Sequence, residues 1–194
     1  MELIGKMRHD HPLLVLAVKE EAQFLDTEFP VLLTGMGKVN AAIALAAVLA
    51  EGPRPASVIN LGTAGALQPG LSGTHVVGTV IQHDLDDAVL HTLTGDTYGP
   101  PLPLRDGGGL TLATGDRFIA TQADRRRLAA QASLVDMEGY ALAAASQRAG
   151  VALRIVKHVS DEAGDGAATT WRDTVADCAR ALADWVSHHA PSFS

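Results

Sequence analysis

Three carboxylates stand close together in the stretch from Leu134 to Glu162, which reads LVDMEGYALAAASQRAGVALRIVKHVSDE. Asp136 and Glu138 lie in what reads as a turn, and Asp161 follows an apolar run. Carboxyl groups can act as a general acid and a general base when burial or neighbouring charges adjust their pKa values. The stretch therefore predicts an active site, while a pair of solvated turns is the alternative reading.

A helix and a strand position these acids. Tyr140 to Ala149 is rich in alanine, which favours a helix that lies close against a sheet, and Gly150 ends it. Val151 to Val159 is apolar and β-branched, which is typical of an interior strand. In open α/β sheets ligands bind at the carboxyl ends of the strands. We therefore expect Ser160 and Asp161, which follow this strand, at the binding edge.

Strands and helices alternate along the rest of the chain. Strands are expected over Leu13–Val18, Val31–Gly37, Ser57–Gly62, Thr74–Gln82 and Gly109–Asp116. Helices are expected over Lys38–Glu51 and Ala123–Ala132, and from near Thr170, where Asp173 completes a capping-box spacing. Leu93–Gly109 is dense in Gly and Pro and predicts an irregular excursion. The alternation predicts one α/β domain over residues 1–194, with a largely parallel sheet between helices.

Composition argues against several classes of protein. The net charge of −7 disfavours binding to nucleic acid or to an anionic membrane surface. Cys178 is the single cysteine, so neither an internal disulfide nor a thiolate metal cluster can form. No apolar run approaches the length of a membrane span, and Met1–Asp10 lacks a signal-peptide core. We therefore expect a cytoplasmic protein with no membrane partner.

Two glycine-containing segments follow predicted strands. Gly35-Met-Gly37-Lys-Val-Asn40 nearly matches a dinucleotide fingerprint, but Asn40 replaces the third glycine and the next strand lacks the ribose-binding acid. A nicotinamide cofactor is therefore not expected, although backbone N–H groups at a helix start can hold an anion or a hydroxyl. Gly62 and Gly65 either form a tight turn or admit a ligand close to the backbone.

Two further groups of side chains have an ordinary structural reading. His83, Asp84, Asp86 and Asp87 are candidate metal ligands, but no second cluster completes a coordination sphere, so a solvated loop is favoured and no metal is expected. Trp171 belongs to the apolar stripe of the last helix, yet it lies near enough to Asp161 in sequence to reach a pocket.

Several segments together resemble one family. LTGMGKVNAA, INLGTAGAL, TGDRFI, LVDMEGYALA and VSDEA occur in the order found in the nucleoside phosphorylase and nucleosidase superfamily, and AVKEEAQFL resembles the N-terminal element of methylthioadenosine/S-adenosylhomocysteine nucleosidases. The resemblance covers nearly all of Leu13–Trp171. It implies a three-layer, Rossmann-like phosphorylase/hydrolase fold with a mixed, mostly parallel sheet. It also implies cofactor-free hydrolysis of the N-glycosidic bond of a purine nucleoside, and a homodimer.

The resemblance carries roles for individual residues. Asp161 matches the acid that protonates N7 of the purine, Glu21 the residue that activates water, and Glu138 the group on the ribose hydroxyls. Ser160 matches the residue that orients the acid. Further substrate-binding positions are Met137 at the ribose, Phe118 and Ile119 at the base, Thr63, Ala64 and Gly65, and Trp171 near the 5′ substituent.

Hydrolysis of an N-glycosidic bond requires these residue types, independently of the resemblance. Adenine leaves poorly as an anion, so an acid such as Asp161 must deliver a proton as the C–N bond breaks. A carboxylate such as Glu138 stabilises the oxocarbenium-like sugar. Water must arrive on the opposite face, which requires a base such as Glu21. In the analogous inverting glycosidases the two carboxyl groups stand roughly 6.5–9.5 Å apart.

The chain departs from the family in three places. It is shorter between Tyr98 and Leu110, where PPLPLRDGGG replaces an additional helix that contributes to the pocket rim and to subunit contact. Thr63 stands where a serine is common. Lys157 replaces an arginine near the water site, which keeps the charge and loses the bidentate fork. The 5′ specificity and the dimer therefore stay open.

Three alternatives remain beside the nucleosidase. A purine nucleoside phosphorylase is disfavoured because the carboxylates of Glu20 and Glu21 would repel phosphate. A hydrolase of futalosine-type nucleosides fits a trimmed pocket rim. A nucleoside sensor without catalysis fits a fragmentary pocket, but binding alone does not require an acid and a base on opposite faces.

Overall fold

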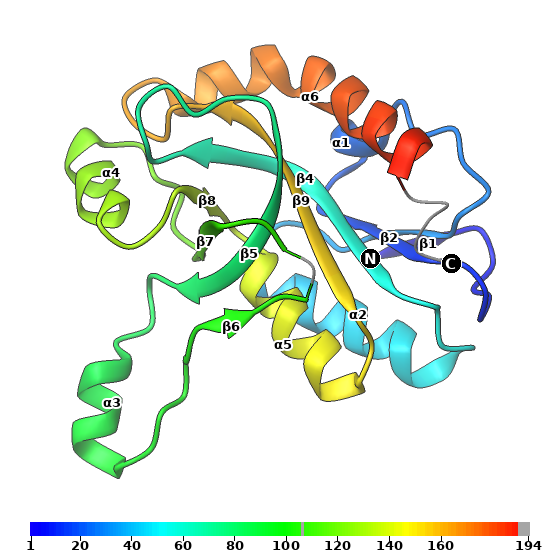
Figure 1. Cartoon of the computed structure of the whole chain (residues 1–194), viewed down its shortest axis with the longest axis horizontal. Helices are drawn as coiled ribbons and strands as arrows, with labels where there is room; N and C mark the ends of the chain where they lie inside the picture. Colours follow the sequence, from blue (N-terminus) through cyan, green and yellow to red (C-terminus); the bar gives the residue numbers. More distant parts are fainter. Residues whose placement is uncertain (106, 190–194) are drawn as a thin grey trace.

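The computed structural model describes residues 1–105 and 107–189, which form a β-sheet with helices on both faces (Figure 1). The strands are β1 (Glu2–Ile4), β2 (Leu13–Leu16), β3 (Val31–Leu33), β4 (Val58–Ala66), β5 (Thr74–Gln82), β6 (Leu102–Pro103), β7 (Leu110–Thr114), β8 (Leu134–Asp136) and β9 (Leu153–Asp161). The helices are α1 (Lys19–Ala22), α2 (Lys38–Glu51), α3 (Asp87–Thr94), α4 (Gln122–Ala129), α5 (Gly139–Ala149) and α6 (Ala167–His189).

The sheet combines parallel and antiparallel neighbours. Its strand order is β1-β3-β2-β4-β8-β7-β5-β6, and β9 pairs with both β4 and β5. Pairing is parallel for β2–β3, β2–β4, β4–β9, β5–β7 and β7–β8, and antiparallel for β1–β3, β4–β8, β5–β6 and β5–β9. The mixed, mostly parallel sheet is therefore confirmed. The strands β4, β9, β5, β7 and β8 close into a ring, which an open sheet would not do.

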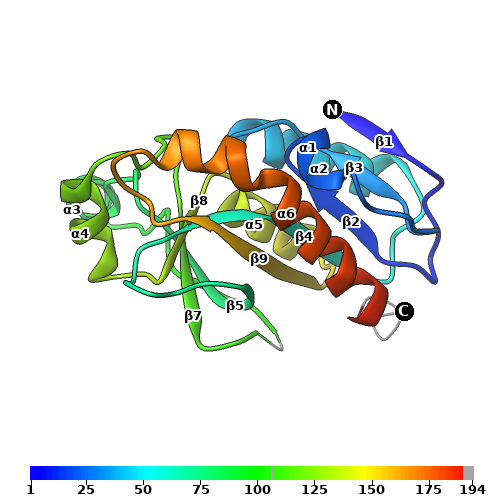
Figure 2. The same ribbon diagram turned by 90° about the horizontal axis from the view of Figure 1, so that it is seen from above.

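Apolar side chains pack on both faces of the central strands. Helices α2 and α5 lie on one face, and α6 crosses β4 and β9 on the other (Figure 2). Because β4 is covered on both sides, eight of its nine residues are buried, as expected for a strand between two helical layers. A smaller cluster joins α4 to the sheet through Leu128 and Ile119. These layers hold the strand ends rigidly in place.

Several element boundaries follow local sequence signals. The predicted helix Lys38–Glu51 and strand Thr74–Gln82 have the bounds of α2 and β5. Helix α5 ends at Gly150, whose φ of 68° lies in the left-handed region that glycine adopts at little cost. The predicted ends of these elements are therefore confirmed.

Several local predictions are wrong, including the following three. Gly62 and Gly65 do not form a tight turn but lie within β4. Asp136 ends strand β8 rather than occupying a turn, because β8 pairs with β7 and β4, which are distant in sequence. Helix α6 begins at Ala167, and the Thr170 hydroxyl donates to the backbone carbonyl of Gly166 instead of capping the helix.

The segment that follows β5 contains a helix that the sequence did not predict. Asp86 caps it by accepting a hydrogen bond from the backbone N–H of Val89, and Gly95 ends it in the left-handed region. No residue of α3 is buried, and the helix projects from the body of the molecule (Figure 1). Strand β6 then returns the chain to the edge of the sheet beside β5.

Candidate active site

A cavity of about 220 Å³ lies where β4, β8 and β9 meet helix α6. The structure brings all eleven predicted site residues into its wall: Glu21, Thr63, Ala64, Gly65, Phe118, Ile119, Met137, Glu138, Ser160, Asp161 and Trp171. Glu21 and Asp161, which come from opposite ends of the chain, therefore face one cavity and not two. A single small molecule bound there can contact both carboxyl groups.

The absent side chains of two glycines allow this convergence. A Cβ atom on Gly65 would lie 2.8 Å from Cβ of Ala163 and 3.2 Å from Oδ1 of Asp161. A Cβ atom on Gly62 would lie 3.1 Å from Nζ of Lys157. Both glycines thus allow protein side chains to approach the backbone of the sheet closely. That they also admit a ligand stays a prediction.

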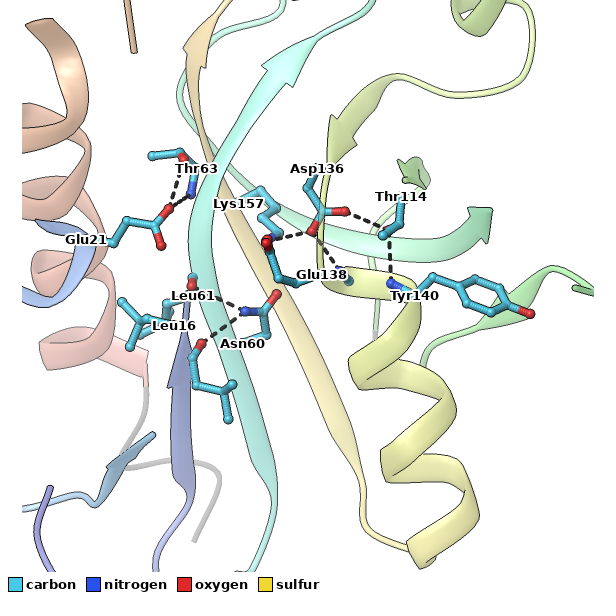
Figure 3. Close-up of polar contacts among 12 residues, drawn as sticks. Leu16, Glu21, Asn60, Leu61, Thr63, Thr114, Asp136, Glu138, Tyr140 and Lys157 are labelled. Atoms are coloured by element: carbon cyan, nitrogen blue, oxygen red, sulfur yellow. Dashed lines mark hydrogen bonds and ion pairs between the residues drawn. The ribbon is translucent and has the colours of Figure 1, made fainter. Parts of the chain in front are cut away.

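Glu21 is held by one oxygen of its carboxylate. Oε1 accepts hydrogen bonds from the backbone N–H and from the hydroxyl of Thr63, each at 2.8 Å (Figure 3). Oε2 is buried and has no hydrogen-bond partner among the residues that the structure describes. A buried carboxylate oxygen without a partner is costly, and it is available to accept a hydrogen bond from water or a ligand.

Asp161 is held through both of its oxygens. The Ser160 hydroxyl donates to Oδ2 at 2.8 Å, and the backbone N–H of Ala163 donates to Oδ1 at 2.8 Å. Ala163 has a φ of 38°, in the left-handed region that residues with a Cβ rarely adopt. This strained turn directs the backbone N–H of Ala163 at Oδ1 and so orients the carboxylate.

Glu138 lies at the start of α5 and reaches the first turn of α2. The backbone N–H of Gly37 donates to its Oε1 at 2.7 Å. Burial raises the pKa of Glu138 to about 7, and the negative charge of Asp136 acts in the same direction, while Lys157 and the Gly37 N–H oppose it. The anion expected at this glycine segment is thus a carboxylate of the protein itself.

Lys157 supplies the positive charge beside these acids. Its Nζ lies 2.9 Å from Oδ2 of Asp136, and both side chains are almost completely buried (Figure 3). Burial alone would lower the pKa of Lys157, but the charges of Asp136, Glu138 and Glu21 outweigh it, so the pKa is raised. Lys157 is therefore a buried ammonium whose charge is shared among three carboxyl groups.

Asp136 anchors this cluster to the fold. Its Oδ1 accepts a hydrogen bond of 2.6 Å from the Thr114 hydroxyl, and its Oδ2 accepts one of 2.8 Å from the backbone N–H of Gly139. The Thr114 oxygen in turn accepts from the backbone N–H of Tyr140 (Figure 3). Asp136 and Thr114 thereby accept the backbone N–H groups of Gly139 and Tyr140 in the first turn of α5. This helix carries Glu138 at its N-cap.

Eight further residues line the cavity without a role in the sequence prediction: Ala17, Met36, Arg117, Val135, Asp136, Ala163, Ala168 and Arg172. Met36 and Arg117 lie inside two of the segments quoted above, LTGMGKVNAA and TGDRFI, so those segments could have marked them. Asp136 is one of the three acids of the predicted active site, and the sequence gives no separate role for it. Nothing in the local sequence distinguishes Arg172, which simply follows Trp171 in α6.

The acidic segment after β5 is used by the fold. Asp84 forms an ion pair of 2.6 Å with Lys38 and accepts a hydrogen bond from the backbone N–H of Asp116. Asp86 caps α3, and Asp87 accepts from the backbone N–H of Tyr98. No group of three or more potential metal ligands occurs in residues 1–105 and 107–189.

The family model described as "Phosphorylase superfamily" matches residues 26–105 and 102–188. The chain belongs to this superfamily. It is 31% identical over 175 residues to the 5′-methylthioadenosine/S-adenosylhomocysteine nucleosidase of Actinobacillus succinogenes, covering 78% of this chain and 75% of that one. It is 28% identical over 170 residues to the nucleosidase of the same name from Staphylococcus haemolyticus, covering 76% and 74%.

Solved structures support the fold of this superfamily member. The 5′-methylthioadenosine/S-adenosylhomocysteine nucleosidase of Streptococcus pneumoniae with the transition-state inhibitor MT-ImmA has a TM-score of 0.80 at 21% identity, covering 95% of this chain and 100% of that one. Futalosine hydrolase of Helicobacter pylori also has a TM-score of 0.80, at 20% identity, covering 92% and 96%. A helix that could cross a membrane is absent from the described part of this superfamily member.

Replacing Lys157 with Met in this superfamily member should lower the free energy of unfolding at pH 8 by about 3–5 kcal/mol, because it leaves buried carboxylates without a cation. The deficit should shrink at pH 5. The pKa of Glu138 in the folded state is raised to about 7 from 4.5, so Glu138 is protonated at pH 5 and no longer adds an uncompensated charge when the lysine is missing. The stability that this protonation contributes is present at low pH and is lost as the pH rises through 7.

Urea unfolding at the two pH values measures both effects. Lys6→Met, at an exposed lysine, is the control and should change stability by no more than about 0.5 kcal/mol. Adding Asp136→Asn to Lys157→Met should recover part of the loss, because the acid nearest to the missing ammonium is then neutral. A Lys157→Met variant as stable as the wild type at pH 8 would contradict the assigned role of the lysine.

Proposed function

We propose that this protein hydrolyses the N-glycosidic bond of a 5′-modified adenosine, 5′-methylthioadenosine or S-adenosylhomocysteine, and releases adenine. The observation that carries the proposal is that Glu21 and Asp161 face a single cavity, each fixed by hydrogen bonds from its own surroundings. The nucleosidases to which the chain is similar support the choice of substrate.

In the proposed reaction Asp161 delivers a proton to N7 of the purine as the C–N bond breaks. Its carboxyl group lies at the end of β9, and Ser160 and the Ala163 backbone orient it from both sides. This orientation favours proton transfer because the donor is already held in the reactive geometry and loses little conformational entropy in reaching it. Phe118 and Ile119, which also line the cavity, contact the base in this scheme.

Glu138 and Met137 hold the ribose in this scheme. Positive charge develops on the sugar as the base departs, and a carboxylate fixed beside it lowers the energy of that state. The Gly37 N–H donates to Oε1 of Glu138, and in this scheme Oε2 binds the ribose hydroxyls. Lys157 favours the ionised form of Glu138 and so supports this task at neutral pH.

Glu21 activates the water that attacks the sugar. Its Oε1 is engaged by Thr63, so Oε2 is the oxygen that accepts the proton of the water. A carboxylate at this point also opposes the binding of phosphate, which distinguishes hydrolysis from phosphorolysis. Arg117 lies on the cavity wall but is ion-paired with Asp124, at 2.7 Å, and is largely exposed.

A futalosine-type nucleoside is the second candidate substrate. Futalosine hydrolase of Helicobacter pylori is a structural neighbour of this chain. The segment after α3 is short, and Met36 and Phe118, which both line the cavity, are about half exposed. An open rim of this kind would admit a 5′ group larger than a thioether.

The decisive experiment measures base release in phosphate-free buffer from a panel of methylthioadenosine, S-adenosylhomocysteine, adenosine, inosine and a futalosine-type nucleoside. The proposal predicts adenine from the first two compounds. Asp161→Asn should lower kcat by about 10²–10⁴-fold while substrate binding stays measurable, because the proton donor is lost and the shape is kept. Asp165→Asn, at an exposed acid in the same loop, is the matched control.

Each part of the proposal has its own contrary result. Turnover that requires phosphate would identify a phosphorylase. Binding of an adenosine without any product would identify a sensor. Near-normal turnover by Asp161→Asn would remove Asp161 from the role of acid.

We also propose that the protein is a cytoplasmic homodimer. The single cysteine, Cys178, is buried and free, which suits a reducing compartment. Val39 and Ile43 lie one turn apart on α2 with exposed fractions of 66% and 64%, and Met36, at the cavity wall, is also exposed. A second copy packed against this apolar surface would bury it and narrow the cavity rim.

Sedimentation velocity tests the dimer. The wild type should sediment as a dimer, and Val39→Glu/Ile43→Glu should sediment as a monomer, because burying two carboxylates in an interface is costly. Val89→Glu, at an exposed apolar position on α3, is the control and should remain dimeric. A wild type that is monomeric at assay concentration would rule the dimer out.

A further inference from the structure

The indole of Trp171 contacts the group that holds Glu21. Trp171 lies in the second turn of α6, and its Nε1–H donates a hydrogen bond of 2.9 Å to Oγ1 of Thr63 in β4. The same oxygen lies 2.8 Å from Oε1 of Glu21. A chain of hydrogen bonds therefore runs from α6 through the sheet to α1, across 150 residues of sequence from Trp171 to Glu21.

The chemistry of the indole fixes the direction of this chain. An indole N–H can only donate, whereas a threonine hydroxyl has one proton and two lone pairs. Thr63 must therefore use a lone pair for Trp171, and its single proton is left for the Glu21 carboxylate. With the backbone N–H of Thr63 also donating to Oε1, that oxygen accepts two hydrogen bonds, and Oε2 has no partner among the described residues.

We infer that Trp171 is a positioning residue for Glu21: its indole N–H holds the Thr63 hydroxyl with the proton on Oε1, so that Oε2 alone is presented to water. Without the indole, the Thr63 hydroxyl is free to rotate and to donate its proton to the water itself. The water would then lose the orientation that places its proton on Oε2. This inference rests on the proposed hydrolysis and deepens it. It gives Trp171 a second role, an effect of the indole N–H on kcat, beside the contact of its ring with the 5′ substituent.

The shape of the ring and the N–H can be tested apart. Trp171→Phe keeps an aromatic ring and loses the donor, and should lower kcat about tenfold, the size of one lost hydrogen bond to an oriented group. The KM for the substrate should change by less than about threefold, because the ring still covers the cavity. Thr63→Val removes the hydroxyl and keeps the backbone N–H, and should lower kcat by a similar factor.

The double variant decides whether Trp171 acts through Thr63. If it does, Trp171→Phe/Thr63→Val should be no slower than Thr63→Val alone, because the indole then has no hydroxyl to direct. Trp185→Phe, on the same helix and outside the cavity wall, is the matched control and should keep wild-type kcat. Losses that multiply in the double variant, or a Trp171→Phe effect confined to KM, would overturn the inference.

A chemical substitution covers the case in which Trp171→Phe folds poorly. 3-Benzothienylalanine at position 171, in the Trp185→Phe background, keeps the bicyclic shape and replaces only the N–H with sulfur. It should reproduce the loss in kcat, and wild-type kcat in this variant would overturn the inference. If the wild type is active and the losses in kcat of the two single variants multiply in the double variant, this inference alone is refuted. If the wild type releases no base from any nucleoside, the proposed function is refuted and the inference with it.

Discussion

The ion pair between Lys157 and Asp136, buried between the sheet and the cavity, is the interaction on which the site depends. An isolated buried charge costs several kcal/mol, so one ammonium can remain in the interior only because acids surround it. The acids depend on it equally, since Glu138 already has a pKa raised to about 7 with the lysine present. Asp136 is ion-paired with Lys157 and accepts a hydrogen bond from the start of α5, which leaves Glu138 and Glu21 available to a ligand.

The closed ring of strands explains why these groups meet. Strand β9 pairs with β4 and β5, and β8 pairs with β4 and β7, so the ends of β4, β8 and β9 are held beside one another. Gly65, opposite both Val135 and Asp161, has no room for a side chain. The geometry of the cavity is thus set by backbone pairing, and the catalytic chemistry proposed for it uses side chains on a rigid frame.

The sequence predicted those features that depend on local pattern. The α2 boundaries and the Gly150 stop follow from periodicity and from glycine's access to the left-handed region, and the site residues follow from short motifs whose order resembles a family. The sequence did not predict contacts between residues that are distant in the chain. The tight-turn reading of Gly62 is wrong because Lys157, which lies beside Gly62, is distant in sequence. The hydrogen bond from Trp171 to Thr63 likewise has no signature in either segment. Residues that act through partners distant in sequence can be identified only from the three-dimensional structure.

A structure with a non-hydrolysable adenosine analogue tests the central claim most directly. The account predicts N7 of the base within hydrogen-bond distance of the Asp161 carboxyl group, the ribose hydroxyls on Glu138, and an ordered water on Oε2 of Glu21 facing the anomeric carbon from the side opposite the base. A nucleoside bound with Glu21 and Asp161 on the same face of its sugar, or bound outside this cavity, would contradict it.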